Sequence, residues 1–92
     1  MSEPARHRIE IVNEKGLHAR ASAKLAEVVE GFDARALISK DGLQASGDSI
    51  MGLLMLAAAK GSFIEVETSG NQAEALAHAI VELVADRFGE GS

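Results

Sequence analysis

The hydrophobic pattern of the sequence changes its period at Gly16, and this change restricts the chain to folds that combine strands with helices. Before this glycine, residues 8–11 alternate polar with apolar side chains, the period-two pattern of a strand with one buried face. Residues 13–16 interrupt the alternation. From His18 onward the apolar residues recur at intervals of three and four, as on the buried face of an amphipathic helix, and Gly31 is placed to end that helix.

The remaining pattern predicts three more strands and two more helices. Residues 34–39 and 43–46 have strand character and are joined through Asp41-Gly42, a pair that supplies the positive φ of a tight hairpin. Ser49 can cap a short helix, residues 63–68 alternate again, and Asn71 offers a cap for a last helix that reaches about Arg87. The order β-α-β-β-α-β-α favours an α+β fold, a four-stranded antiparallel sheet with three helices on one face and solvent on the other.

The length of 92 residues suits one domain with one core, so we expect a single domain over residues 1–92. Its ordered part is predicted to span about residues 7–88, with loose ends at residues 1–5 and in the final Gly-Glu-Gly-Ser. The chain is also expected to be a monomer.

Composition and charge exclude several classes of function. The net charge of −5 argues against a nucleic-acid partner, because binding to phosphates needs a basic surface. The chain has no cysteine and no His-x-x-x-His or Glu-x-x-His pair, so neither a metal site nor any other cofactor is predicted. The N-terminal residues lack the apolar core of a signal peptide, and the longest apolar run stops at Lys60, too short for membrane insertion. A cytoplasmic protein is expected.

His18 is the strongest candidate for a reactive side chain. It lies at the predicted start of the first helix, where free backbone N–H groups and the positive end of the helix dipole attract an anion, and Arg20 adds a cation. These positive neighbours favour a neutral ring, whose nitrogen can attack an electrophilic phosphorus. Gly16 would allow close approach of a partner or a phosphate. On these residues alone, a polar histidine with only a capping role remains equally open.

The segment after Ser49 is the second candidate. Ser49 is a helix cap in the simpler interpretation and a phosphorylation switch in the other. Leu53 and Leu56 can serve the core while Ile50, Met51 and Leu54 face a partner, although the whole apolar stripe can equally belong to the core. His7 and His78 are predicted to be ordinary polar positions.

Two motifs together resemble a known family. "GLHARASAKL" at residues 16–25 and "GDSIMGLLML" at residues 47–56 resemble the histidine-containing phosphocarrier protein (HPr) family of the phosphotransferase system, and the resemblance extends over roughly residues 7–88. It implies an open-faced β-sandwich. It also implies a phosphoryl carrier, not an enzyme, in which Nδ1 of His18 accepts a phosphoryl group from phosphorylated enzyme I, charged by phosphoenolpyruvate, and passes it to an enzyme IIA-type acceptor.

The resemblance assigns further roles to individual residues. Arg20 corresponds to the active-site arginine of the family, and Ser49 to the serine that HPr kinase/phosphorylase modifies in some bacteria. Partner contacts are expected from Gly16, Leu17, Arg20, Lys24, Ile50, Met51 and Leu54.

The first motif departs from many sugar-uptake members of the family. Ala21 replaces the proline that follows their arginine, and Glu27 and Glu30 replace basic residues on the exposed helix face. "HARASAK" looks more like the nitrogen-related, NPr-like branch, in which the relay is regulatory. Three alternatives remain. The chain can be a carrier of the sugar-uptake branch, a non-catalytic regulator that binds a partner through the Ser49 helix, or a ligand-binding regulatory domain with a merely structural His18.

Overall fold

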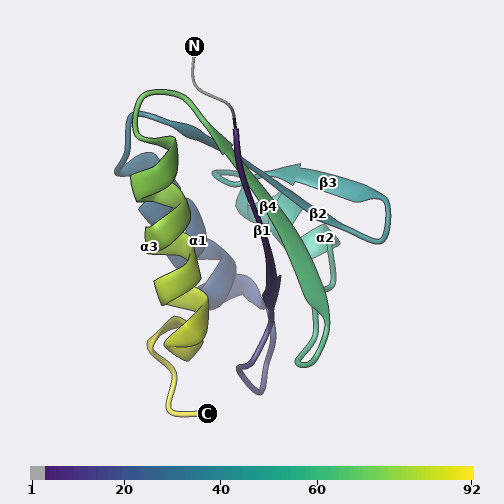
Figure 1. Cartoon of the computed structure of the whole chain (residues 1–92). Helices are drawn as coiled ribbons and strands as arrows, with labels where there is room; N and C mark the ends of the chain where they lie inside the picture. Colours follow the sequence, from purple (N-terminus) through teal and green to yellow (C-terminus); the bar gives the residue numbers. More distant parts are fainter. Residues whose placement is uncertain (1–3) are drawn as a thin grey trace.

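Four strands form one antiparallel sheet, and three helices follow the order that the sequence predicts (Figure 1). The structure is a computed structural model of the chain and describes residues 4–92. The strands are β1 (Ala5–Glu10), β2 (Arg35–Lys40), β3 (Leu43–Ser46) and β4 (Phe63–Ser69), arranged in the sheet as β1-β4-β2-β3. The helices are α1 (Ala19–Glu30), α2 (Ile50–Met55) and α3 (Ala73–Ala85), and a 3₁₀ turn, η1, follows at Arg87–Gly89.

The first strand is longer than its alternation indicates. It begins at Ala5, which pairs with Thr68, and it continues to the pair of Glu10 with Phe63. The expected loose end at residues 1–5 is therefore wrong for Ala5, because β4 supplies a backbone partner that the local pattern does not reveal. Met1 to Glu3, also within that prediction, lie outside the described residues.

The hairpin between β2 and β3 confirms the turn read from the sequence. Lys40 pairs with Leu43 across it, and Asp41 and Gly42 have φ values of 50° and 84°. Both turn residues are left-handed, the backbone that a two-residue hairpin turn requires to match the twist of its strands.

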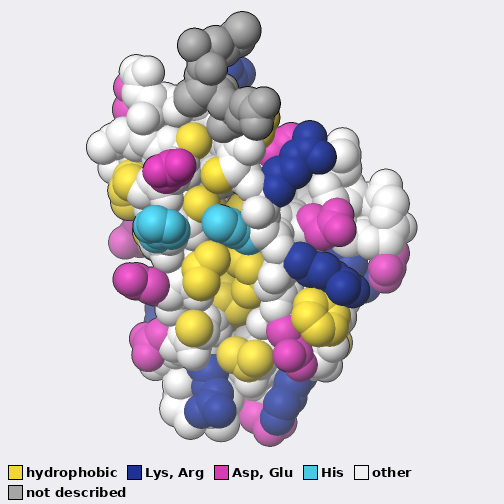
Figure 2. All heavy atoms as spheres, viewed as in Figure 1, with side chains coloured by type: hydrophobic (Ala, Val, Ile, Leu, Met, Phe, Trp, Pro, Cys, Tyr) yellow, Lys and Arg dark blue, Asp and Glu magenta, His cyan; other side chains and the backbone are white. Residues whose placement is uncertain are grey.

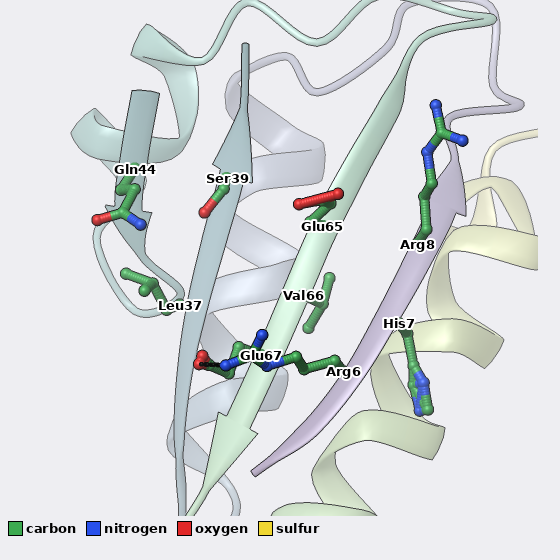
Figure 3. A pocket seen from close by; sticks show the side chains of 9 residues that line it. All are labelled: Arg6, His7, Arg8, Leu37, Ser39, Gln44, Glu65, Val66 and Glu67. Carbon is green, nitrogen blue, oxygen red and sulfur yellow. Dashed lines mark ion pairs between the residues drawn. The ribbon is translucent and has the colours of Figure 1, made fainter. Parts of the chain in front are cut away.

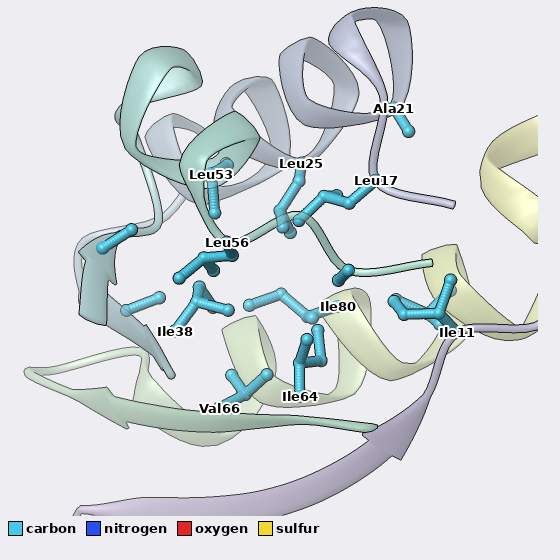
Figure 4. Packing of buried hydrophobic residues seen from close by; sticks show 14 of the residues in the cluster. Ile11, Leu17, Ala21, Leu25, Ile38, Leu53, Leu56, Ile64, Val66 and Ile80 are labelled. Carbon is cyan, nitrogen blue, oxygen red and sulfur yellow. The ribbon is translucent and has the colours of Figure 1, made fainter. Parts of the chain in front are cut away.

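The core lies between the sheet and the helices (Figure 4). Ile38, Ile64 and Val66 project from β2 and β4 toward the helices, where Leu25 of α1 and Ile80 of α3 are fully buried. The opposite sides of the strands are exposed or only partly covered, so the fold class, an open-faced antiparallel sheet covered on one side, is confirmed. Among residues 4–92, no helix combines the length and the apolar character needed to cross a membrane.

The start of α3 differs from the prediction that Asn71 caps this helix. The helix begins at Ala73 without a side-chain cap. Asn71 instead donates from Nδ2 to Oδ2 of Asp33 at 2.8 Å, and Oε1 of Gln72 accepts from the Asp33 amide at 2.6 Å. Both side chains bond to Asp33 because the turn before β2 lies beside the turn before α3. These two turns are about 38 residues apart in sequence.

Candidate functional site

His18 is the N-cap of α1, held there by backbone contacts on both sides. Its amide donates to the Gly16 carbonyl at 2.9 Å, and its carbonyl accepts from Ser22 N–H at 2.8 Å as the first bond of the helix. Leu17 N–H donates to the carbonyl of Ala58 at 2.8 Å, which joins this turn to the segment after α2. The His18 backbone is extended, as expected for a cap, so its ring projects over the first turn of the helix.

The Nδ1 atom of the His18 ring faces the amino end of α1. It accepts a hydrogen bond from the backbone N–H of Arg20 at 3.3 Å. A nitrogen that accepts carries a lone pair, and here that lone pair lies where unpaired amides and the helix dipole attract negative charge. The lone pair of Nδ1 thus lies beside a position whose charge distribution suits an anion.

The Nε2 atom of the ring contacts a carboxylate that the sequence did not predict. Oε2 of Glu90 lies against Nε2, and Oε1 of Glu90 accepts from Nδ2 of the fully buried Asn13 at 3.0 Å. The side chains of His18 and Glu90 are only 26% and 15% exposed, so this contact is shielded from most of the solvent. The prediction of a loose C-terminal tail is wrong. The side-chain carboxylate of Glu90 contacts the His18 ring, and O of Ser92 accepts from the Glu14 N–H at 3.2 Å.

Phe88 fixes the path of the tail from α3 to the His18 ring. Its side chain is fully buried in the core, and its carbonyl accepts from Nζ of Lys24 at 2.6 Å. Arg87, Phe88 and Gly89 all have left-handed backbones, with φ of 55°, 54° and 75°. A left-handed conformation costs a residue with a side chain about 1–2 kcal/mol, so the sharp reversal is maintained by burial of the Phe88 ring.

Hydrogen bonding keeps Glu90 ionised. The bond from Asn13, followed by the contact with His18, holds the pKa of the Glu90 carboxyl below its ordinary value, against the smaller opposing effect of burial. An ionised carboxylate has only acceptors, so Nε2 is the ring nitrogen positioned to donate to Glu90, while Nδ1 accepts from the Arg20 N–H.

The structure distinguishes among the residues expected to contact partners. Arg20 is exposed and forms no ion pair with any of residues 4–92. Leu17 is 4% exposed and belongs to the core, so a direct partner contact of its side chain is wrong. Lys24 is half-buried with its ammonium group on the Phe88 carbonyl, where it supports the tail instead of extending toward a partner.

Gly16 has a different role from the predicted one. It is buried with φ of 65°, and a Cβ built on it would lie 2.4 Å from the carbonyl oxygen of Ala58. The glycine is therefore required for close packing within the chain, and its backbone does not provide an approach for a partner.

The α2 segment follows one of the two interpretations that its sequence left open, with a buried side and an exposed side. Leu53 and Leu56 are buried, whereas Ile50, Met51 and Met55 are 42%, 71% and 74% exposed. With the half-buried Leu54, the three exposed residues form what we call the α2 patch (Ile50, Met51, Leu54 and Met55). The prediction that the whole stripe belongs to the core is wrong, because six residues of helix present only one side to the sheet.

Ser49 caps α2 as predicted. Its Oγ accepts from the Gly52 amide at 3.1 Å, and its side chain is partly exposed. Asp48, next to it, accepts from the hydroxyl of Ser46 at 2.5 Å. The Ser49 hydroxyl can thus be reached from solvent at the amino end of the helix that carries the α2 patch.

The sequence patterns did not identify three residues that build this site: Asn13, Phe88 and Glu90. The sequence predicts a last helix that reaches about Arg87, whereas α3 ends at Ala85 and Phe88 lies in η1. Asn13 was assigned only to a break between elements, and Glu90 to a tail. No local pattern identifies Glu90, because its partner is 72 residues away.

The other histidines lie away from this site. His7 points from β1 toward α3 (Figure 3), and His78 is exposed on α3. Within residues 4–92, no three His, Cys, Asp or Glu side chains are grouped so that they could hold a metal ion.

A shallow hollow on the open face of the sheet contains none of the predicted site residues. It has a volume of about 450 Å³ and is lined by charges of both signs, including Arg6, Arg8, Glu65 and Glu67 (Figure 3). Arg6 pairs with Glu67 at 3.7 Å, and the guanidinium of Arg8 lies 4.3 Å from the centre of the Phe63 ring. Figure 2 shows acidic and basic side chains interspersed over this side of the molecule, so the hollow has no strong field of one sign.

Comparisons with known proteins match nearly the whole described chain. A family model described as the PTS HPr component phosphorylation site matches residues 5–86. The phosphocarrier protein HPr of Neisseria meningitidis serogroup B is 49% identical over 84 residues, 90% of this chain and 93% of the relative. The phosphocarrier protein NPr of Escherichia coli K12 is 45% identical over 83 residues, 89% of this chain and 92% of the relative.

A solved structure has the same fold. The crystal structure of HPr-C-His from Thermoanaerobacter tengcongensis superposes with a TM-score of 0.91 at 31% identity, covering 96% of this chain and 99% of the other. The relatives thus carry both names, HPr and NPr, at similar identity.

Proposed function

This chain belongs to the HPr family of phosphocarrier proteins, and on that premise we propose that His18 is the residue that carries the phosphoryl group. Members of the family are carriers and do not themselves catalyse a reaction. In this proposal His18 accepts the group from phosphorylated enzyme I, which phosphoenolpyruvate charges, and passes it to an enzyme IIA-type acceptor. The supporting observation is that Nδ1 of His18 faces the amino end of α1 while Nε2 is bound to Glu90.

The chemistry follows from the positions of the two ring nitrogens. The lone pair on Nδ1 attacks the phosphorus of the donor, an N–P bond forms, and the bond between phosphorus and the donor breaks with its electron pair leaving on the donor. The bound phosphoryl group carries about two negative charges, which the first-turn amides of α1 and the exposed Arg20 guanidinium can bind. Transfer to the acceptor is the same displacement with His18 as the leaving group.

The α2 patch is the proposed docking surface for enzyme I and the acceptor. α1 packs against α2, and the amide of Leu17 bonds to the segment after α2, so the patch is held in a fixed relation to His18. Exposed methionines and isoleucine suit a partner with an apolar surface, because burying them on contact removes apolar area from water. The Arg20 guanidinium adds a positive charge at the edge of the contact between the α2 patch and its partner.

We further propose a regulatory, nitrogen-type relay, with phosphorylation of Ser49 by an HPr kinase/phosphorylase as a second level of control. Glu27 and Glu30 are exposed on α1. They make the C-terminal half of the exposed side of this helix acidic, which favours partners other than those selected by a basic helix. A phosphate on Ser49 would add charge beside Asp48 at the edge of the α2 patch and weaken docking of an acidic or apolar partner.

The decisive experiment is phosphorylation by phosphoenolpyruvate and the matching enzyme I. The parent chain should become an acid-labile phosphoprotein, and His18→Ala should not be labelled, whereas the matched control His78→Ala, on the exposed face of α3, should be labelled normally. Labelling of His18→Ala at the parent level contradicts the proposal. Presenting the phosphorylated protein to nitrogen-type and sugar-type enzyme IIA domains then tests the branch, since preferential transfer to the sugar-type domain would reject the nitrogen-type assignment.

The exposure of the α2 patch also supports a second function, binding a regulatory partner without phosphoryl transfer. Binding of this kind should survive His18→Ala and fail in Met51→Asp, which puts a charge in the centre of the patch. If Met51→Asp leaves every partner interaction unchanged, the patch is not the docking surface.

A further inference from the structure

On the premise that the α2 patch docks enzyme I and the acceptor, as in the proposed function, we propose that this patch is also a reversible oxidation switch. Peroxide converts the side chains of Met51 and Met55 to methionine sulfoxides, and the oxidised patch no longer fits an apolar partner surface. The switch acts through sulfur and is therefore chemically independent of His18 and Ser49.

The sulfur atoms of this chain are concentrated on the α2 patch. The sequence has no cysteine and three methionines, of which Met1 lies outside the described residues. Met51 and Met55 both belong to α2, and the buried core of residues 4–92 contains no methionine. Sulfur is the atom that mild two-electron oxidants attack in proteins. Since no thiol competes for the oxidant, peroxide changes the docking surface and leaves the core unmodified.

Both methionines are open to a dissolved oxidant. Met51 and Met55 are 71% and 74% exposed, the largest exposed fractions among the exposed large apolar side chains of residues 4–92. They are four residues apart on one helix, so their side chains are neighbours on the same face. Susceptibility to oxidation rises with exposure, so both side chains should react much as methionines of an unfolded chain do.

The helix should keep its fold when these two sulfurs are oxidised. Leu53 and Leu56 attach α2 to the rest of the protein, and both side chains are buried in the core (Figure 4). Ser49 caps the start of the helix through the amide of Gly52. None of these contacts involves a methionine, so the added oxygens remain in water in the free protein. The cost of oxidation arises only when a partner removes the patch from water.

The oxidation step is a two-electron transfer of one oxygen atom. A lone pair of the thioether sulfur attacks one oxygen of hydrogen peroxide, an S–O bond forms, and the O–O bond breaks with its electron pair leaving on the other oxygen. After proton transfer the products are a sulfoxide and one water molecule. Reduction uses two thiols, which are oxidised to a disulfide while the oxygen leaves as water, and methionine sulfoxide reductases catalyse this step.

A sulfoxide makes the apolar patch polar. The flexible thioether packs against irregular apolar surfaces, whereas the sulfoxide oxygen accepts hydrogen bonds from water that it loses on docking. Met55 is the last residue of α2, and the segment after it leads to Ala58, whose carbonyl accepts from the Leu17 amide next to His18. The change in polarity therefore reaches the end of the patch that is joined to the His18 turn.

The test measures labelling of the peroxide-treated chain by enzyme I and phosphoenolpyruvate, after catalase has removed the peroxide. Peptide mass spectrometry locates the added oxygen atoms. The chain concentration that gives the half-maximal rate should rise by about tenfold or more, the order expected when one polar group is buried without a partner, while the rate at saturation is retained. Treatment with methionine sulfoxide reductases should restore the untreated value.

The matched control is the double variant Met51→Leu, Met55→Leu, which keeps apolar side chains of similar volume and has no sulfur in the patch. It retains Met1, so any effect of oxidation at the N-terminus appears in this variant as well. Each protein is compared with its own untreated form. The treated and untreated forms of the double variant should give the same half-maximal concentration.

Four results would overturn the switch. Met51 and Met55 could oxidise far more slowly in the folded chain than in urea, or a fully oxidised parent could keep its half-maximal concentration. Peroxide could impair the double variant as much as the parent, or the oxidised parent could lose its far-UV circular dichroism, which would assign the effect to unfolding. If the untreated parent is not labelled on His18, the proposed function itself fails and the switch fails with it, so the untreated sample separates the two failures.

Discussion

Replacing Phe88 with alanine should destabilise the protein strongly, because this one side chain connects the C-terminal segment to the core. The ring is fully buried among the core residues, and removing such a ring costs about 3–5 kcal/mol in lost burial and cavity formation. Domains of this size are stable by about 5–15 kcal/mol, so the variant should fold with little stability to spare. Urea unfolding followed by far-UV circular dichroism measures the loss. With a slope of about 1 kcal/mol per M, the midpoint should fall by roughly 3 M or more.

The left-handed backbone of Phe88 provides an internal control. At an ordinary helical or extended position, glycine is less stable than alanine by about 0.5–1 kcal/mol. At φ of 54°, however, alanine is itself disfavoured by about 1–2 kcal/mol, so Phe88→Gly should be as stable as Phe88→Ala or more so. Phe88→Leu, which keeps most of the apolar volume, should lose much less.

Two results would refute this account of the tail. A loss below about 1 kcal/mol in Phe88→Ala would mean that the ring does not anchor the segment in solution. A Phe88→Gly variant clearly weaker than Phe88→Ala would mean that the backbone is not left-handed there. If both expectations hold, Phe88→Ala should also change the NMR signals of the His18 ring, because Glu90 would no longer be kept beside the ring.

Three further changes test separate parts of the structure. Gly16→Ala should lose about 2–4 kcal/mol in urea unfolding, because the new Cβ would lie 2.4 Å from the Ala58 carbonyl oxygen on a left-handed backbone. Ser49→Ala should lose about 1 kcal/mol through its missing helix cap, while Ser49→Asp, which can cap, should remain near the parent in stability. The pKa of Glu90 is lowered from 4.5 in the folded state. The stabilisation that ionised Glu90 gives to the folded state is therefore complete above that value and is lost as the pH falls through the lowered pKa. The difference in unfolding free energy between the parent and Glu90→Gln should therefore disappear on acidification, and a difference that persists in acid would contradict the ionised state assigned to Glu90.

The elements and the candidate histidine at the start of a helix could be predicted from the sequence because each depends on neighbours within one or two turns. The change of period near Gly16, the Asp41-Gly42 turn and the cap at Ser49 are short-range features, and the structure has all of them. His18 at a helix start is equally local. The division of the short apolar helix into a buried and an exposed side was left open by its sequence, because six residues are too few for the period to select a face.

Only the tertiary structure decided which distant segments meet. The sheet order β1-β4-β2-β3 makes β4 the neighbour of the first strand, and this pairing extends β1 back to Ala5. The same long-range packing buries Leu17, engages Lys24 with the tail and brings Glu90 to His18 across 72 residues. Periodicity reports whether a residue faces a core, but it carries no information on which segment lies on the other side. For this protein the sequence by itself selected His18 as the candidate ring, and the fold decided that Nε2 of this ring faces Glu90 while Nδ1 faces the start of α1.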